Sequence, residues 1–224
     1  MRIKLSVLCL LALASIAFPQ APQPVIDAGT CSANSFEAQF FHFRYEVPKG
    51  WFALKDNVRM EENRKRYETQ LAEALKKDGP NGETHRTEGG KEITQTHKTE
   101  VFPPYNLLVA APAALTSGNT DPLPRITIFA QKRITMLMEA GDPAKLLTMF
   151  PKIKVLRGPE NVLLSGHKFV RADFQFPSGA FLSKFTTVVG DYLIEFDLRA
   201  NNEKDLTDLA RSTESVVFLS DSSS

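Results

Sequence analysis

The apolar and polar positions in the second half of the chain include three β-rich runs, at residues 167–177, 179–189 and 192–200. In the last run Tyr192, Ile194, Phe196 and Leu198 face one way and Glu195 and Asp197 the other, with the period of two that is typical of a half-buried β-strand. Gly190-Asp191, between the last two runs, is a strong signal for a tight hairpin turn. We therefore predict an antiparallel three-stranded meander that buries one face.

The polar face of the last run carries Glu195 and Asp197. Side chains two residues apart on a strand share a face, so this pair could serve as a general acid and base. Such a pair also needs a partner group and a pocket that separate the two pKa values, and the neighbouring sequence provides neither. We expect a solvated outer face, on which Arg199 offsets the negative charge.

The first half of the chain opens with the aromatic run 36–47, which alternates cleanly from Phe41 onward. We predict one half-buried strand here, followed by a tight turn at Pro48-Lys49-Gly50. After the turn, Trp51 and Phe52 are expected to enter the core, which makes the run a packing element and not a platform for a ligand. Two further strands are expected at 105–110 and 125–132.

Three segments have helical patterns. The first is 57–77, with Asn57 as N-cap; the second is 143–150, with Asp142 as N-cap and Pro151 as the stop signal. The third is capped by Asn201 or Asn202, and its apolar stripe consists of Leu206, Leu209, Ala210, Thr213, Val216 and Val217. A mostly antiparallel β-sheet flanked by helices is an α+β fold.

Between these elements lies 78–104, which is rich in glycine and polar residues and poor in large apolar ones. We expect a long mobile loop here, interrupted at best by a short hairpin, and either functional or passive. A second loop is expected at 110–124. The predicted organisation is a flexible N-terminal segment 18–35, a single α+β domain 36–219 and a disordered tail 220–224.

Residues 1–17 are typical of a secretory signal peptide, because a basic start and an apolar run lead to the small-x-small site Ser15-Ile16-Ala17. The apolar run is shorter than the ~20 residues that span a bilayer as a helix, so an uncleaved anchor is the alternative. Cleavage would make the protein secreted or periplasmic. It would also leave Cys31 as the single cysteine, which we interpret as an incidental residue in a frayed segment, with a nucleophile or a dimer-forming thiol as alternatives.

Composition and motifs argue against several classes of function. With 27 Lys+Arg and 26 Asp+Glu, the chain lacks the basic excess that nucleic-acid binding requires. Common catalytic signatures are absent from the sequence. His85 and His97, with the nearby carboxylates Glu88, Glu92 and Glu100, could form a metal site, but incidental histidines in a polar loop are the interpretation we adopt. No catalytic, cofactor-binding or metal-binding residue is assigned.

The order of these elements resembles the PsbP-like α/β/α sandwich family, whose members include photosystem extrinsic proteins, a Ran-binding nuclear import factor and secreted bacterial proteins. The residues that carry the resemblance are Tyr45, Pro48, Gly50 and Trp51, then Gly190, Asp191 and Tyr192, and finally Ser215 to Phe218. It covers about 36–219, with 78–104 as an insertion, and brings no shared catalytic residues.

The resemblance implies a non-catalytic binding or assembly module with an unknown protein or envelope partner and no stable membrane span after signal cleavage. Two alternatives remain: an enzyme whose site is built from dispersed residues, and an envelope protein anchored by its uncleaved N-terminus.

Overall fold

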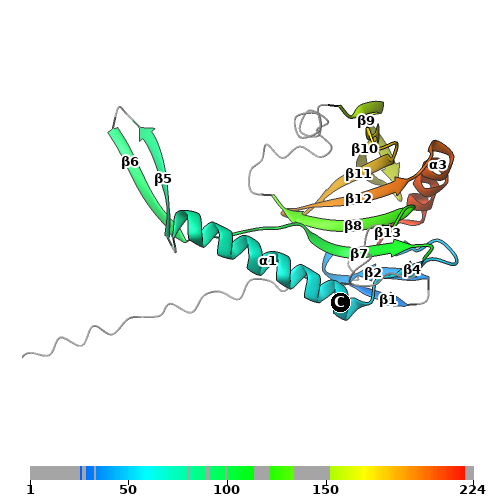
Figure 1. The fold of residues 1–224 in the computed structure, drawn as a ribbon, viewed down its shortest axis with the longest axis horizontal. Helices are drawn as coiled ribbons and strands as arrows, with labels where there is room; N and C mark the ends of the chain where they lie inside the picture. The colour runs from blue at the N-terminus through cyan, green and yellow to red at the C-terminus, as the bar shows by residue number, and fades with distance from the viewer. Residues whose placement is uncertain are drawn as a thin grey trace, which may run out of the picture.

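The structure is a computed structural model, and it describes residues 26, 29–32, 34–79, 81–88, 91–98, 100–113, 122–133 and 152–219. The predicted signal peptide, the predicted helix 143–150 and the tail 220–224 lie outside the described residues. Within them, a four-stranded sheet, a seven-stranded sheet and two α-helices form the α+β fold that the sequence predicts, and a separate two-stranded hairpin extends from it (Figure 1).

The larger sheet contains seven described strands in the order β4-β7-β8-β12-β11-β10-β9, and every pairing is antiparallel. Its strands are β4 (Phe52–Ala53), β7 (Tyr105–Ala111), β8 (Arg125–Lys132), β9 (Lys154–Leu164), β10 (His167–Gln175), β11 (Phe181–Val189) and β12 (Tyr192–Ala200). The pairing of β10, β11 and β12 confirms the predicted three-stranded meander and its hairpin turn at Gly190-Asp191. Strand β9 was not predicted and forms one edge of the sheet.

A smaller sheet lies against one face of the larger one and holds four described strands in the order β1-β2-β3-β13. They are β1 (Thr30–Ser32), β2 (Ser35–Ala38), β3 (Phe43–Glu46) and β13 (Val217–Phe218). Aromatic rings join the layers: the Phe43 and Tyr45 rings lie 5.8 and 5.9 Å from that of Phe196 on β12. Because both rings are fully buried, this interface is the main core.

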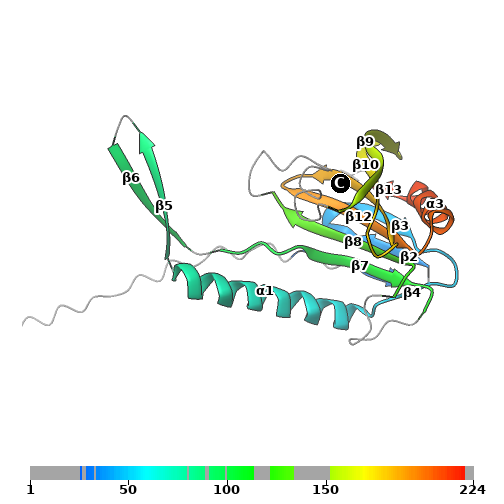
Figure 2. The ribbon, with the colours of Figure 1, turned by 45° about the horizontal axis from the view of Figure 1, so that its top comes forward.

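Helix α3 (Glu203–Ser212) covers the same face of the larger sheet beside the smaller sheet (Figure 2). The predicted Asn202 cap is confirmed, since its side chain accepts a hydrogen bond from the backbone N–H of Asp205. The predicted stripe extends too far at its end. The chain leaves the helix through a 3-10 turn, η2 (Thr213–Ser215), and Val217 lies in β13.

The aromatic run 36–47 is not the single strand predicted. It forms β2, the 3-10 turn η1 (Gln39–Phe41) and β3, and these two strands pair with each other. His42 ends the turn in the left-handed region, at φ 51°, which re-aims the chain so that both strands bury their aromatic side chains. Trp51 is only partly buried, at the margin of the core.

The folded domain also begins before the predicted boundary at residue 36. Strand β1 pairs with β2, with Cys31 opposite Phe36, so 30–32 belongs to the sheet and not to a flexible segment. The buried Gly29 allows the chain before β1 to pack closely against Phe36. Its φ is 69°, and a Cβ at this position would lie 2.5 Å from the Phe36 ring, so only glycine fits.

Helix α1 (Asp56–Asp78) is anchored only by its first half. The buried Arg59 donates hydrogen bonds to the backbone oxygens of Leu107 on β7 and of Gly29, and Asn63 exchanges two with the Asn106 backbone. Among the described helix residues after Asn63, no side chain between 64 and 77 is buried. The helix begins at Asp56 with Lys55 as N-cap and without a side-chain cap, so the predicted cap at Asn57 is wrong.

The predicted loop 78–104 contains more regular structure than expected. Strands β5 (Asn81–Glu88) and β6 (Lys91–Lys98) pair along their full length, and this hairpin projects from the end of α1 in both ribbon views. The Gly89-Gly90 dipeptide between them is a two-residue hairpin signal that the low apolar content obscured.

Neither of the described helices is long and apolar enough to cross a membrane.

A candidate ligand-binding cleft beside helix α3

The candidate site begins with an irregularity in the pairing of β9 and β10. Arg171 is opposite Glu160, but Asp173 is opposite Arg157, so two β9 residues, Gly158 and Pro159, face a single residue of β10. Proline has no N–H for the ladder and is tolerated because β9 is an edge strand. As a result, the bulge brings Arg157 level with Asp173.

Asp173 lies at the centre of an ion-pair network and is only 6% exposed. Its Oδ1 accepts hydrogen bonds from Ser183 Oγ at 2.5 Å and Arg171 Nε at 3.0 Å. Its Oδ2 accepts one from Arg171 Nη2 at 2.9 Å and lies 3.2 Å from Arg157 Nε. Four groups thus surround the two oxygens, which matches the acceptor capacity of a carboxylate.

The two arginines are held in fixed positions by these contacts. The Arg171 guanidinium also lies over the Phe185 ring, 5.1 Å from its centre. Arg157 donates from Nη1 to Glu160 at 2.5 Å, and this hydrogen bond raises the pKa of Arg157 above its ordinary value. Both guanidinium groups keep further N–H donors that these bonds do not use.

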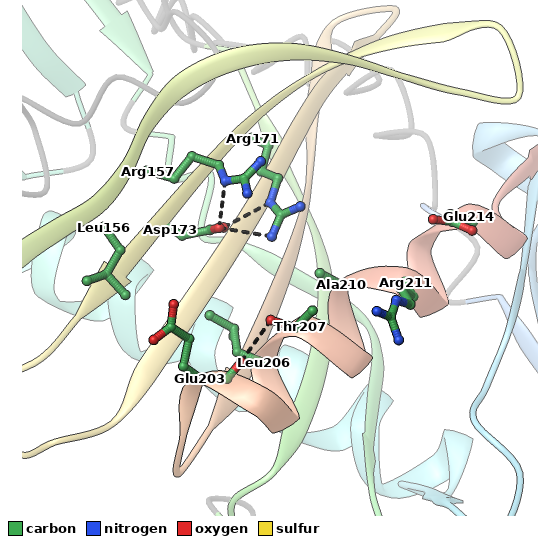
Figure 3. A pocket seen from close by; sticks show the side chains of 10 residues that line it. All are labelled: Leu156, Arg157, Arg171, Asp173, Glu203, Leu206, Thr207, Ala210, Arg211 and Glu214. Carbon is green, nitrogen blue, oxygen red and sulfur yellow. Dashed lines mark hydrogen bonds and ion pairs between the residues drawn. The ribbon is translucent and has the colours of Figure 1, made fainter.

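These arginines form one wall of an open cleft of about 300 Å³ between β9–β10 and α3 (Figure 3). The apolar part of its lining comes from Leu156, Leu206 and Ala210, and the last two are buried in the main core. The opposite wall belongs to α3 and η2 and consists of Glu203, Thr207, Arg211 and Glu214. A cleft with an apolar floor and a few ordered polar groups is the usual form of a small-molecule site.

A second hollow, of about 520 Å³, lies beside the turn after β3 and is lined by Ser212, Ser215 and Lys49, among others. Two of its hydroxyls are already engaged: Ser212 bonds the Tyr45 hydroxyl at 2.7 Å, and Ser215 Oγ accepts from the Glu46 backbone N–H at 3.1 Å. These two bonds connect α3 and the turn after it to β3. The cleft at Asp173 is therefore the stronger candidate for a ligand.

On the other face of the larger sheet, Glu195 and Asp197 are not solvated as predicted. Their side chains are 13% and 11% exposed, and Lys184 of β11 contacts Glu195 and lies 3.3 Å from Asp197 Oδ1. Burial opposes the charge on Lys184, but the two carboxylates outweigh this effect and raise its pKa. The cluster is a partly buried ion-pair network, which the sequence could not distinguish from a solvated face.

The other sequence candidates are dispersed. His85 is paired with Thr94 and His97 with Gly82, three positions apart along the β5–β6 ladder. In the part of the chain that the structure describes, no group of three His, Cys, Asp or Glu residues could hold a metal ion. Cys31 is not frayed but paired in β1, and burial raises the pKa of its thiol.

Sequence reasoning missed the residues that build the cleft: Arg157, Arg171, Asp173 and Ser183. They come from three strands and meet only through the register of β9, β10 and β11. One local signal was available. Ser165 and Gly166 both have positive φ, as in the two-residue turns that join hairpin strands, so their Ser-Gly sequence could have revealed β9.

No protein-family model and no curated protein match this chain. Among solved structures, it is similar to the cyanobacterial PsbP (CyanoP) of Synechocystis sp. PCC 6803, with a TM-score of 0.46 and 9% identity over 85% of this chain and 98% of that one. It is also similar to PA94 of Pseudomonas aeruginosa, described as a protein of unknown function, with a TM-score of 0.31 and 11% identity over 58% and 90%. The first of these two proteins bears the name of the PsbP family, which the order of elements in the sequence resembles.

Proposed function

We propose that this protein is an exported binding module without catalytic activity, which holds a small charged ligand in the cleft between β9–β10 and α3. The observation that carries the proposal is the Arg157–Asp173–Arg171 network. A buried carboxylate orients two guanidinium groups before any ligand arrives, which lowers the entropic cost of binding. The remaining N–H donors are then available to an anionic group.

The same network favours binding over catalysis. Asp173 is the buried carboxylate of the cleft, and a general base needs a free lone pair toward its substrate. Three hydrogen bonds and the ion pair with Arg157 occupy the two oxygens of Asp173. Ser183, whose Oγ donates to Asp173, is fully buried and does not line the cleft, and Thr207 Oγ1 donates to the Glu203 backbone carbonyl, which is not a base that could activate it.

The exported location rests on the signal pattern in residues 1–17. In the secreted or periplasmic space, the protein would deliver its ligand to, or sense it for, an envelope partner. The β5–β6 hairpin, which projects from the end of α1, is the candidate surface for that partner (Figure 1).

Calorimetric titration of the processed protein with citrate, L-leucine and putrescine tests the proposal. At least one compound should bind, and its binding should be lost in Arg171→Gln. Binding should persist in Lys204→Gln, which removes an exposed charge from α3 outside the cleft. Mass spectrometry should recover the bound compound unchanged. Binding that is insensitive to Arg171→Gln would place the site elsewhere, and chemical conversion would favour the enzyme alternative.

A further inference from the structure

The charges that line the cleft are separated between its two walls. The strand wall presents Arg157 and Arg171, whose charges are balanced by Asp173 between them and by Glu160 beside Arg157, so it offers unused guanidinium N–H donors and no net charge. On the helix wall, Arg211 is paired with Asp208 at 3.2 Å. Within the described residues, Glu203 and Glu214 have no ion-pair partner. The cleft thus offers guanidinium N–H donors on the strand side and carboxylates without an ion-pair partner on the helix side.

This separation selects among ligands by charge. A simple anion would bind the arginines but would face the two carboxylates across the cleft, whereas a cation would face the arginines. A ligand that carries both charges would be complementary to both walls. The volume of about 300 Å³ is at the lower end of the range for small-molecule pockets, which indicates a compact ligand.

The floor adds a further requirement. Leu156, Leu206 and Ala210 present aliphatic surface between the two charged walls. A ligand with an aliphatic body would cover this surface and exclude water from the flanking charges, which strengthens their attraction. The arrangement therefore matches a charged group at each end of the ligand and an apolar part between or beside them.

We infer that the cleft binds a small aliphatic zwitterion of the amino-acid type, with its carboxylate at Arg171 and Arg157 and its ammonium group at Glu203. The inference rests on the proposed function, since it specifies the ligand class of the same cleft. Arg171 would receive the carboxylate through the edge of its guanidinium that Asp173 leaves free.

The test is a calorimetric comparison of L-leucine with N-acetyl-L-leucine, which lacks the ammonium group, and L-leucinamide, which lacks the carboxylate. In the processed wild-type protein, each analogue should bind at least tenfold more weakly than L-leucine. Glu203→Gln should weaken L-leucine but remove its advantage over N-acetyl-L-leucine. Because Glu203 is exposed, this variant should fold, and Lys204→Gln should keep the wild-type preferences.

The contradicting outcomes are distinct. If N-acetyl-L-leucine binds as tightly as L-leucine, or if Glu203→Gln keeps the wild-type preference, the ammonium contact does not exist and the inference is wrong. If citrate binds in an Arg171-dependent manner and L-leucine does not, the cleft binds anions, so the inference fails while the proposed function stands. If citrate, L-leucine and putrescine all fail to bind, both are wrong.

Discussion

Asp173→Asn should destabilise the protein by removing the charge that organises the cleft. The amide keeps the shape of the side chain but replaces one acceptor oxygen with an N–H donor, which then faces a guanidinium group or the Ser183 hydroxyl. Two charge-assisted hydrogen bonds are weakened or lost, at ~1.5–3 kcal/mol each. The Arg157 side chain is 46% exposed, so water compensates part of the ion-pair energy that it loses.

The expected loss is therefore about 3 kcal/mol, near the lower limit for breaking a buried ion pair. For a domain of this size, that corresponds to a fall in melting temperature of roughly 6–12 °C. Urea unfolding, followed by circular dichroism, measures the free energy directly. Asp191→Asn, which removes an exposed carboxylate at the β11–β12 turn, is the matched control and should change stability by less than about 0.5 kcal/mol.

A double-mutant cycle shows whether the loss comes from the network. Asp173→Asn combined with Arg171→Gln should cost clearly less than the sum of the single variants, because each one breaks the same contacts. If Asp173→Asn is as stable as the control, or if the two losses add, the carboxylate does not hold the arginines. The pre-organised cleft would then have no basis.

Three further predictions concern the fold. Arg59→Met should lower the free energy of unfolding in urea by ~2–5 kcal/mol, because two buried backbone carbonyls lose their donor. Arg64→Met, on the exposed face of the same helix, should cost less than ~1 kcal/mol. Equal losses would contradict the anchoring of α1 by Arg59. Burial raises the pKa of Tyr45, so the folded state retains its proton longer than the unfolded state, and the unfolding free energy should fall above about pH 10 more steeply in wild type than in Tyr45→Phe. Parallel slopes would refute this. Replacing 80–98 with a short Gly-Ser linker should leave the melting temperature within a few degrees, since loop closure changes by only ~0.6 kcal/mol per doubling of length; unfolding would show that the hairpin is part of the core.

The parts of the fold that the sequence predicts well are those determined by local pattern. Strands β10, β11 and β12 come from runs rich in aromatic and β-branched residues, and the side chain of Asn202 caps α3 by accepting from the Asp205 N–H three positions along the chain. Strand β9 escaped because it is an exposed edge strand interrupted by Gly158 and Pro159, so it has little alternation. The hairpin β5–β6 was expected at best as a short interruption of a loop, because its strands contain few apolar residues.

The candidate site could not be predicted from local sequence patterns, because its residues are brought together by strand pairing. Arg157 and Asp173 are sixteen positions apart in the sequence and meet only because a bulge shifts their register. Glu195 and Asp197 illustrate the converse error. Polar residues that alternate with apolar ones predict a solvated face, but Lys184 on the next strand compensates their charge and allows them to be largely buried.

The most direct test of the central claim is a titration of the processed, ¹⁵N-labelled protein with L-leucine and with citrate, followed by ¹H–¹⁵N correlation spectra. The account predicts that the largest shifts for at least one compound belong to backbone amides of 156–157, 171–173 and 203–211, which surround the cleft. Shifts confined to 193–199 on the strand that carries Glu195 and Asp197, or no shifts with either compound, would contradict it.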